Sequence, residues 1–105
     1  MREHSIILPT HDNDGRDLSV THTALKRELI EYFDGYSATA QTGGWVNDKG
    51  ELFEEPSIRY TVADATVQYR LDRIIHIAKK YGTAANQQAM YVVLDGNVKI
   101  ITIGE

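Results

Sequence analysis

The sequence predicts one α+β domain, residues 1–105, with elements in the order strand–helix–strand–strand–helix–strand–strand. Three observations support this prediction. Two segments carry apolar residues at helical spacing, with charged residues on the opposite side. Five shorter segments show the apolar runs or the alternation that are typical of strands. Glycine, proline, asparagine and aspartate separate the segments, which indicates turns.

The first strand and the first helix are predicted from the N-terminal third. An apolar run at residues 5–8 predicts the strand. The helix is expected to begin near Asp17 or Ser19, because either side chain can accept a backbone N–H bond at a helix start. Its apolar residues recur every four positions on one face: Leu25, Leu29 and Phe33. Asp34-Gly35 is expected to end it, since glycine readily adopts the left-handed conformation.

Two central strands are predicted next. Residues 36–41 alternate between apolar and polar side chains, and residues 57–62 do the same. The sequence between them contains a typical turn at residues 47–50. Pro56 is expected just before the second of these strands, where a missing N–H does no harm.

A second helix and a hairpin complete the chain. The helix is expected to begin at Asp64 or Thr66 and to end at Gly82. The following residues form its predicted apolar stripe: Val67, Leu71, Ile74, Ile75 and Ala78. Strands are predicted at residues 90–94 and 98–103, because Asp95-Gly96 between them is a strong hairpin signal.

The first six elements follow the ferredoxin-like order, and the last strand is an added C-terminal hairpin strand. Both helices should cover one face of an antiparallel sheet. The other face must be wet or covered by another molecule, and such faces are often oligomer contacts. We therefore expect an oligomer.

Composition excludes several classes of function. The net charge of −4 argues against a general nucleic-acid binder, which would show a basic patch. The chain has no cysteine, which rules out disulfides, thiolate metal sites and cysteine nucleophiles. No apolar run approaches the roughly 18 residues of a membrane span. We expect a cytoplasmic protein without membrane contact.

The segment 43–56 is the strongest candidate site. Gly43-Gly44 permits close approach of a ligand to the backbone, and Trp45 offers a flat face for a base or a cation. Glu54 and Glu55 are adjacent, so in a strand they should point to opposite faces, one of them toward a pocket. The plainer interpretation is a long hairpin whose tryptophan packs on the sheet edge and whose acids discourage aggregation.

The loop at residues 10–16, which contains Thr10 and His11, is a second candidate. Its carboxylates resemble part of a calcium loop, but that pattern requires glutamate six residues after Gly15, and Thr21 stands there. A solvated turn is one interpretation, and a loop that grips a ligand is the other. The four histidines lack the spacing of a zinc site, so no metal is expected.

One family shares a further pattern. Gly44-Trp45, the run from Glu54-Glu55-Pro56 to Val62, the helix at residues 66–81 and the strand at residues 90–94 appear here in order. In this arrangement the chain resembles the phage-encoded S-adenosylmethionine (SAM) lyases, formerly called SAM hydrolases. The family pattern has tyrosine where this chain has Trp45.

The resemblance implies a ferredoxin-like homotrimer that binds SAM between subunits. It implies that the carboxylate of SAM attacks its own γ-carbon, releasing methylthioadenosine and homoserine lactone without a cofactor. Glu54 or Glu55 would hold the ammonium or sulfonium group, and Tyr60 would line the same cleft. Thr10, His11, Gly44 and Trp45 would contact the substrate. Such an enzyme would act in the host cytoplasm, against restriction-modification.

A different class of function also fits the sequence. A small acidic phage or bacterial protein could bind and inhibit a host protein through its open sheet face. That alternative predicts that Trp45 and Tyr60 lie on an exposed patch without a concave pocket, whereas the enzyme requires a pocket lined by one of the two glutamates.

Overall fold

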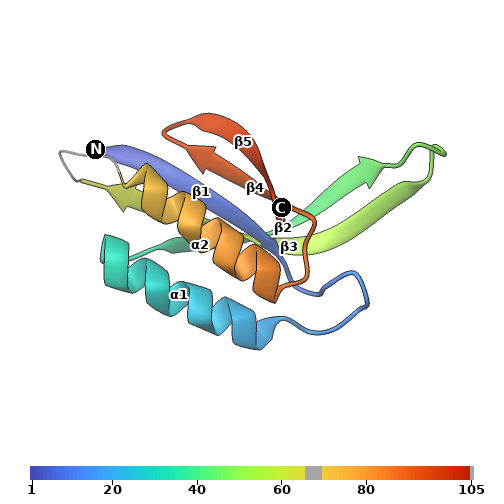
Figure 1. The fold of residues 1–105 in the computed structure, drawn as a ribbon, viewed down its shortest axis with the longest axis horizontal. Helices are drawn as coiled ribbons and strands as arrows, with labels where there is room; N and C mark the ends of the chain where they lie inside the picture. The colour runs from blue at the N-terminus through green and yellow to red at the C-terminus, as the bar shows by residue number, and fades with distance from the viewer. Residues whose placement is uncertain (66–69, 105) are drawn as a thin grey trace.

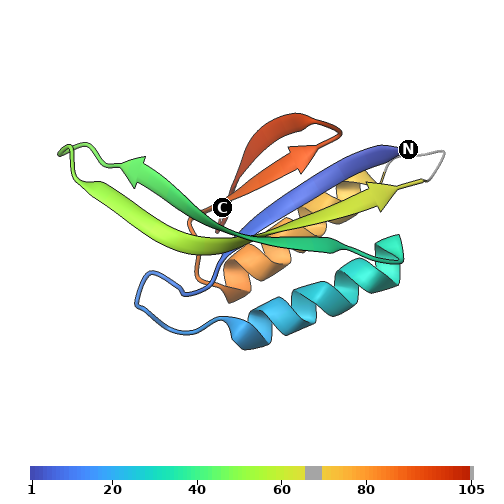
Figure 2. The same ribbon diagram turned by 180° about the vertical axis from the view of Figure 1, so that it is seen from behind.

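The computed structural model describes residues 1–65 and 70–104, which form two helices and a five-stranded sheet (Figures 1 and 2). The elements are β1 (Arg2–Pro9), α1 (Ser19–Phe33), β2 (Ser37–Val46), β3 (Leu52–Asp64), α2 (Leu71–Ala84), β4 (Ala89–Leu94) and β5 (Asn97–Thr102). Their order along the chain is the predicted one.

The sheet has the strand order β2-β3-β1-β4-β5, and all neighbouring strands are antiparallel. Its first four strands have the ferredoxin-like arrangement, and β5 differs from it by extending the sheet beside β4. Figures 1 and 2 show both helices on the same face of this sheet, as predicted. We call this the helix face and the opposite side the open face.

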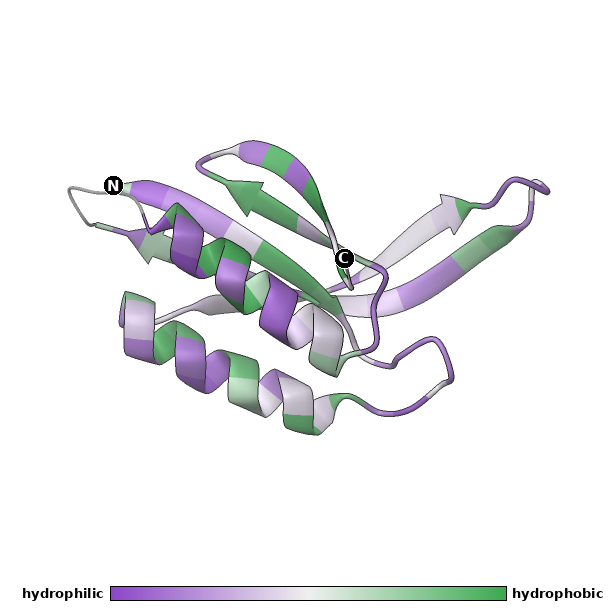
Figure 3. Ribbon diagram, viewed as in Figure 1, coloured by the Kyte–Doolittle hydropathy of each residue, from purple (hydrophilic) through white to green (hydrophobic). Residues whose placement is uncertain are grey.

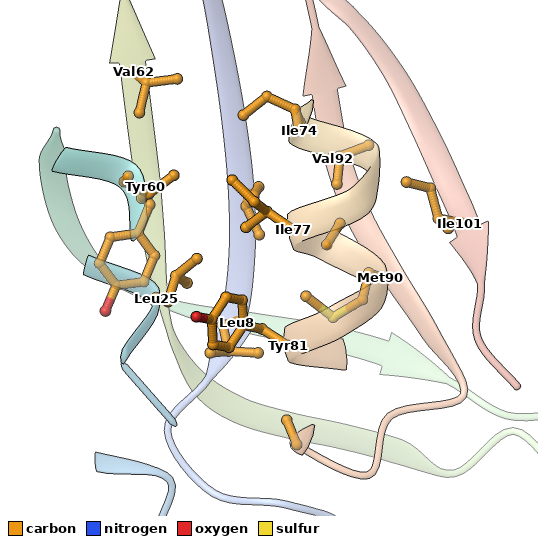
Figure 4. Close-up of a cluster of buried hydrophobic side chains, with 14 of the residues drawn as sticks. Leu8, Leu25, Tyr60, Val62, Ile74, Ile77, Tyr81, Met90, Val92 and Ile101 are labelled. Atoms are coloured by element: carbon orange, nitrogen blue, oxygen red, sulfur yellow. The ribbon is translucent and has the colours of Figure 1, made fainter. Parts of the chain in front are cut away.

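The core lies between the helices and the helix face (Figure 4). Helical and strand periods bring apolar residues to this layer from α1, α2 and four strands. Its fully buried members include Ile6, Leu8, Leu25, Leu29, Ile74, Ile77, Met90 and Val92. Figure 3 shows hydrophilic and hydrophobic residues alternating along both helices, which is the pattern of helices covered on one side.

A polar pair is also buried in this layer. His4 Nε2 lies 3.2 Å from the Asp64 carboxylate, and both side chains are buried. The backbone N–H of Asp95 donates to His4 Nδ1 at 3.0 Å, so Nε2 is the ring nitrogen that donates to Asp64. The pair therefore joins β1, the end of β3 and the β4–β5 turn.

Strands β2 and β3 continue beyond the other strands as a projecting hairpin, residues 42–56, which we call the arm (Figure 1). Its two strands pair with each other, from Thr42 opposite Pro56 to Val46 opposite Leu52. At its tip, the Asn47 side chain accepts the N–H groups of Lys49 and Glu51, which confirms the predicted turn.

Helix α1 ends at Asp34-Gly35 as predicted, but Asp34 itself, at φ 67°, takes the left-handed conformation that was expected of Gly35. One of the two predicted starts of α2 was wrong. Asp64 ends β3 and does not begin α2, which the structure describes from Leu71. The alternative start at Thr66, and Val67 in the predicted stripe, lie outside the described residues.

The predicted roles of Gly82 and Pro56 were also wrong, and packing explains both. Gly82 lies inside α2 and does not end it. Glycine is required there because a Cβ would come within 2.6 Å of Met90 Cγ. The glycine thus lets the helix approach β4 instead of ending the helix. Pro56 lies inside β3, and its carbonyl accepts the N–H of Thr10 just beyond the end of β1. The pairing of β1 with β3 ends at Pro9 opposite Ser57, so the missing N–H of Pro56 costs no bond between these two strands.

Candidate functional site

The open face contains a cavity of about 490 Å³ at the base of the arm. We call it the arm cavity. Residues from β1, β2, β3, β4 and the segment before β4 line it: Ile7, Pro9, Gln41, Gly43, Gly44, Trp45, Glu55, Ser57, Arg59, Gln87, Ala89, Met90 and Tyr91. Its volume falls within the range of small-molecule sites, which is roughly 300–1,000 Å³.

Strand alternation determines which side chains of β3 reach this cavity. Glu55, Ser57 and Arg59 line it, at every second position. Glu54 is absent from the lining and lies opposite Gly44 in the β2–β3 register. The adjacent glutamates therefore differ in position as alternation predicts, and Glu55 is the one that borders a cavity.

Trp45 borders the same cavity from β2. Its ring stacks on that of Phe53, its register partner, with centroids 4.7 Å apart and planes 19° apart. The indole remains 53% exposed, so one side of it is open to a ligand. A Cβ added at Gly43 would meet nothing within 4 Å, which leaves open space beside the backbone here.

The polar lining offers two opposite charges and several neutral groups. Glu55 supplies a carboxylate and Arg59 a guanidinium, four residues apart on one strand. The amides of Gln41 and Gln87 can donate and accept hydrogen bonds. With the indole, this set can bind a ligand that carries a flat ring, a cation and an anion.

Two other predicted residues, Thr10 and Tyr60, line a different cavity, of about 320 Å³. It lies on the helix side, beside α1 and the β1–α1 loop. Tyr60 is 1% exposed there, and its hydroxyl lies 2.6 Å from His22 Nδ1. His22 Nε2 donates to the Pro9 carbonyl at 2.8 Å, which leaves Nδ1 to accept the tyrosine hydroxyl.

Burial raises the pKa of Tyr60 to about 12, with Tyr36 adding to the shift. The phenol therefore stays protonated at ordinary pH and serves as a hydrogen-bond donor. Sequence reasoning missed His22 as its partner, because that histidine shares a face of α1 with Leu25 and Leu29 and showed no motif. Its position three residues before the core residue Leu25, which places both on one helix face, was the available signal.

His11 lies outside both cavity linings, at the start of the β1–α1 loop. Its Nδ1 lies 2.9 Å from the Thr10 hydroxyl, and its Nε2 lies 3.9 Å from Asp17. Within the same loop, Asp12 accepts the backbone N–H groups of Asp14 and Arg16. The Asp12 carboxylate thus organises the turn, as in the interpretation of this loop as a solvated turn.

Among residues 1–65 and 70–104, no group of three or more histidine, aspartate or glutamate side chains is arranged to hold a metal ion. Neither helix that the structure describes is long and apolar enough to span a membrane.

The fold is that of a small ferredoxin-like domain, and its open face carries a cavity. The chain is similar to a solved phage SAM lyase in complex with S-methyl-5′-thioadenosine, with a TM-score of 0.72 and 17% identity over 95% of this chain and 88% of that one. It is also similar to a phage SAM lyase in the apo state, with a TM-score of 0.66 and 17% identity over 95% and 87%. No family model matches the chain, and no curated protein does.

The two likenesses confirm the distant resemblance at the level of the fold. At 17% identity they concern backbone arrangement, so the roles of individual residues rest on the geometry described above.

Proposed function

We propose that the protein binds SAM in the arm cavity and cleaves it to methylthioadenosine and homoserine lactone. The observation that carries the proposal is the meeting of Glu55 and Trp45 at one cavity in this fold. A carboxylate and an indole are the groups that hold an ammonium or sulfonium cation. The likeness to a lyase structure that contains S-methyl-5′-thioadenosine supports a nucleoside-type ligand.

The proposed reaction is complete within the substrate. One oxygen of the SAM carboxylate forms a bond to the γ-carbon, while the γ-carbon–sulfur bond breaks and its electron pair goes to sulfur. The products are a neutral thioether and a lactone, so no water, oxidant or metal enters the balance. We therefore propose no cofactor.

The protein's part is positioning and charge placement. Opposite charges on carboxylate and sulfonium cancel as the bond forms, so the reaction gains from a site with little water. Holding the tail in a folded conformation removes much of the entropic barrier, which can supply several kcal/mol, on the order of 7 or more in well-oriented systems. Glu55 would bind the ammonium group and fix this conformation.

Tyr60 has no place in this mechanism, because it lies on the helix side of β3 while Glu55 faces the arm cavity. Glu54, Thr10 and His11 are also outside that cavity. A further cavity, of about 480 Å³, is lined by residues of both helices. Its aromatic ring, Tyr32, is already covered by the Arg73 guanidinium, whose carbon lies 3.9 Å from the ring centroid, so that face of the ring is not open to a ligand. The arm cavity is therefore our proposed substrate site.

We also propose a homotrimer that acts in the host cytoplasm as a phage counter to restriction-modification. Large apolar side chains remain exposed on the arm and on β5: Trp45, Val46, Leu52, Phe53, Val98 and Ile100. Exposed apolar groups on a small domain favour subunit contacts. Light scattering would measure the mass, and a monomer would contradict the trimer.

The alternative is a non-catalytic inhibitor that binds a host protein, which the exposed apolar arm would favour. That alternative predicts Trp45 and Tyr60 on one exposed patch without a concavity. Here Tyr60 is buried, and Trp45 borders a cavity. Both observations support the enzyme over the inhibitor.

The decisive experiment compares Glu55→Gln with Glu54→Gln. Purified proteins are incubated with SAM, and methylthioadenosine is quantified by chromatography. We expect Glu55→Gln to lower kcat/KM by about 100-fold or more, as when loss of a positioning contact misplaces the reacting groups. Glu54→Gln should stay within about threefold of the wild type, because a residue outside the site affects transition-state binding little.

Absence of product from the wild type would end the lyase proposal. Equal losses in both variants would show that the site is elsewhere.

A further inference from the structure

Arg59 occupies a special place on the open face. It lies in the middle of β3, between Ile7 of β1 and Thr39 of β2 in register, and it is half-buried. Its side chain lines the arm cavity together with Glu55. A guanidinium at a central strand position loses much of its water, which is unfavourable unless acceptors replace that water.

Within residues 1–65 and 70–104, the structure shows no such acceptor, because Arg59 takes part in no hydrogen bond or ion pair there. Arg2, by contrast, pairs with Asp95 at 2.9 Å, and Arg16 lies 4.0 Å from Asp12. The donors of Arg59 are therefore available to a ligand in the cavity, and a guanidinium is a strong donor to a carboxylate oxygen.

The separation of Arg59 from Glu55 adds to this argument. Their Cα atoms lie on the same side of one strand, roughly 13 Å apart at the usual rise per residue. Glu55 makes no ion pair with Arg59 within the described part of the chain, although both border one cavity. Opposite charges held apart in this way can bind the two charged ends of an amino-acid group.

We propose that Arg59 binds the α-carboxylate of SAM while Glu55 binds its ammonium group. This inference rests on the proposed function. The guanidinium holds one carboxylate oxygen and leaves the other free to reach the γ-carbon. Because the carboxylate loses its negative charge as the bond forms, Arg59 contributes by binding and orientation. Its loss should therefore affect substrate binding more than kcat.

The test uses two unreactive ligands that share the adenosine part. S-adenosylhomocysteine carries the amino-acid group, and methylthioadenosine lacks it. Calorimetric titration compares the wild type with Arg59→Met and Arg59→Lys, after circular dichroism has confirmed that each variant is folded. Arg59→Met should weaken S-adenosylhomocysteine about 10- to 100-fold, as for loss of a charged hydrogen bond. Its affinity for methylthioadenosine should change less than about twofold, and Arg59→Lys should restore part of the loss.

The outcomes separate this inference from the lyase proposal. Equal weakening of both ligands by Arg59→Met, or no weakening of S-adenosylhomocysteine, overturns the role of Arg59 even if the wild type cleaves SAM. Arg59-dependent binding of S-adenosylhomocysteine by a wild type that releases no methylthioadenosine supports the role of Arg59 and rejects the lyase. A wild type that binds neither ligand overturns both.

Discussion

The two faces of β3 differ in what their side chains do. On the helix face, Tyr60 and Val62 are buried at 1% and 2% exposure and belong to the core. On the open face, Glu55 and Arg59 border a cavity, and neither is part of that core. One strand thus serves stability with one set of alternate residues and the proposed binding site with the other. Substitutions on the two faces should have separable effects.

The largest difference is expected on β5, where neighbouring isoleucines face opposite sides. Ile101 is 5% exposed and Ile100 is 57% exposed. Ile101→Ala should lower the free energy of unfolding by about 2–5 kcal/mol, as core truncations do. Ile100→Ala should change it by less than about 0.5 kcal/mol in a monomer, as surface substitutions do.

Urea denaturation measures both values. Similar losses in the two variants would contradict the assignment of the faces, and a concentration-dependent loss in Ile100→Ala would reveal a subunit contact on the open face.

A smaller effect is expected where α2 meets the sheet. Gly82→Ala places a Cβ within 2.6 Å of Met90 and 3.0 Å of Ile103, so this core must shift, which costs about 1–3 kcal/mol. Better helix propensity offsets less than about 1 kcal/mol of that cost. Gly35→Ala is the control, because a Cβ there meets nothing within 4 Å. Thermal unfolding should show a lower Tm for Gly82→Ala alone. An unchanged Tm would show that the helix is not closely packed at this position.

The smallest effect concerns the pH dependence of stability. The pKa of Tyr60 is about 12 in the folded protein and near 10 when unfolded, so folding favours the protonated phenol. Its contribution is complete below pH 10 and is lost as pH rises toward 12. Tyr60→Phe should show a flatter decline of unfolding free energy over this range, although it is less stable at pH 7 because His22 loses its donor. An equally steep decline in the variant would assign the effect to other groups, such as Tyr81, whose pKa is also raised to about 12.

Local patterns were sufficient to predict the order of the elements. Alternation in β3 and four-residue spacing in α1 each reflect the geometry of one element, and Asp95-Gly96 adopts the positive φ angles of a tight hairpin turn, 52° and 83°. Positions decided by contacts between elements were missed. The sequence alone indicates a helix end at Gly82, because the close contact with Met90 comes from another element. It indicates a strand start at Pro56, because the position where β1 ends beside Pro56 is not visible in the sequence.

The candidate site was predictable to the same extent. One hairpin segment contains Gly44, Trp45 and Glu55, so the sequence alone could group them. Gln87 and Tyr91 reach the same cavity from β4 and the segment before it, and only the strand order places them there. The family resemblance grouped Tyr60 with Glu55, although residues five positions apart along a strand point to opposite faces of the sheet.

The Trp45–Phe53 stack has a practical consequence. Trp45 is the only tryptophan in the chain, and its half-exposed ring borders the arm cavity. All of the protein's indole fluorescence therefore originates at the proposed site. The wavelength and intensity of that emission depend on the water around one ring, so the native chain carries its own optical probe of that cavity.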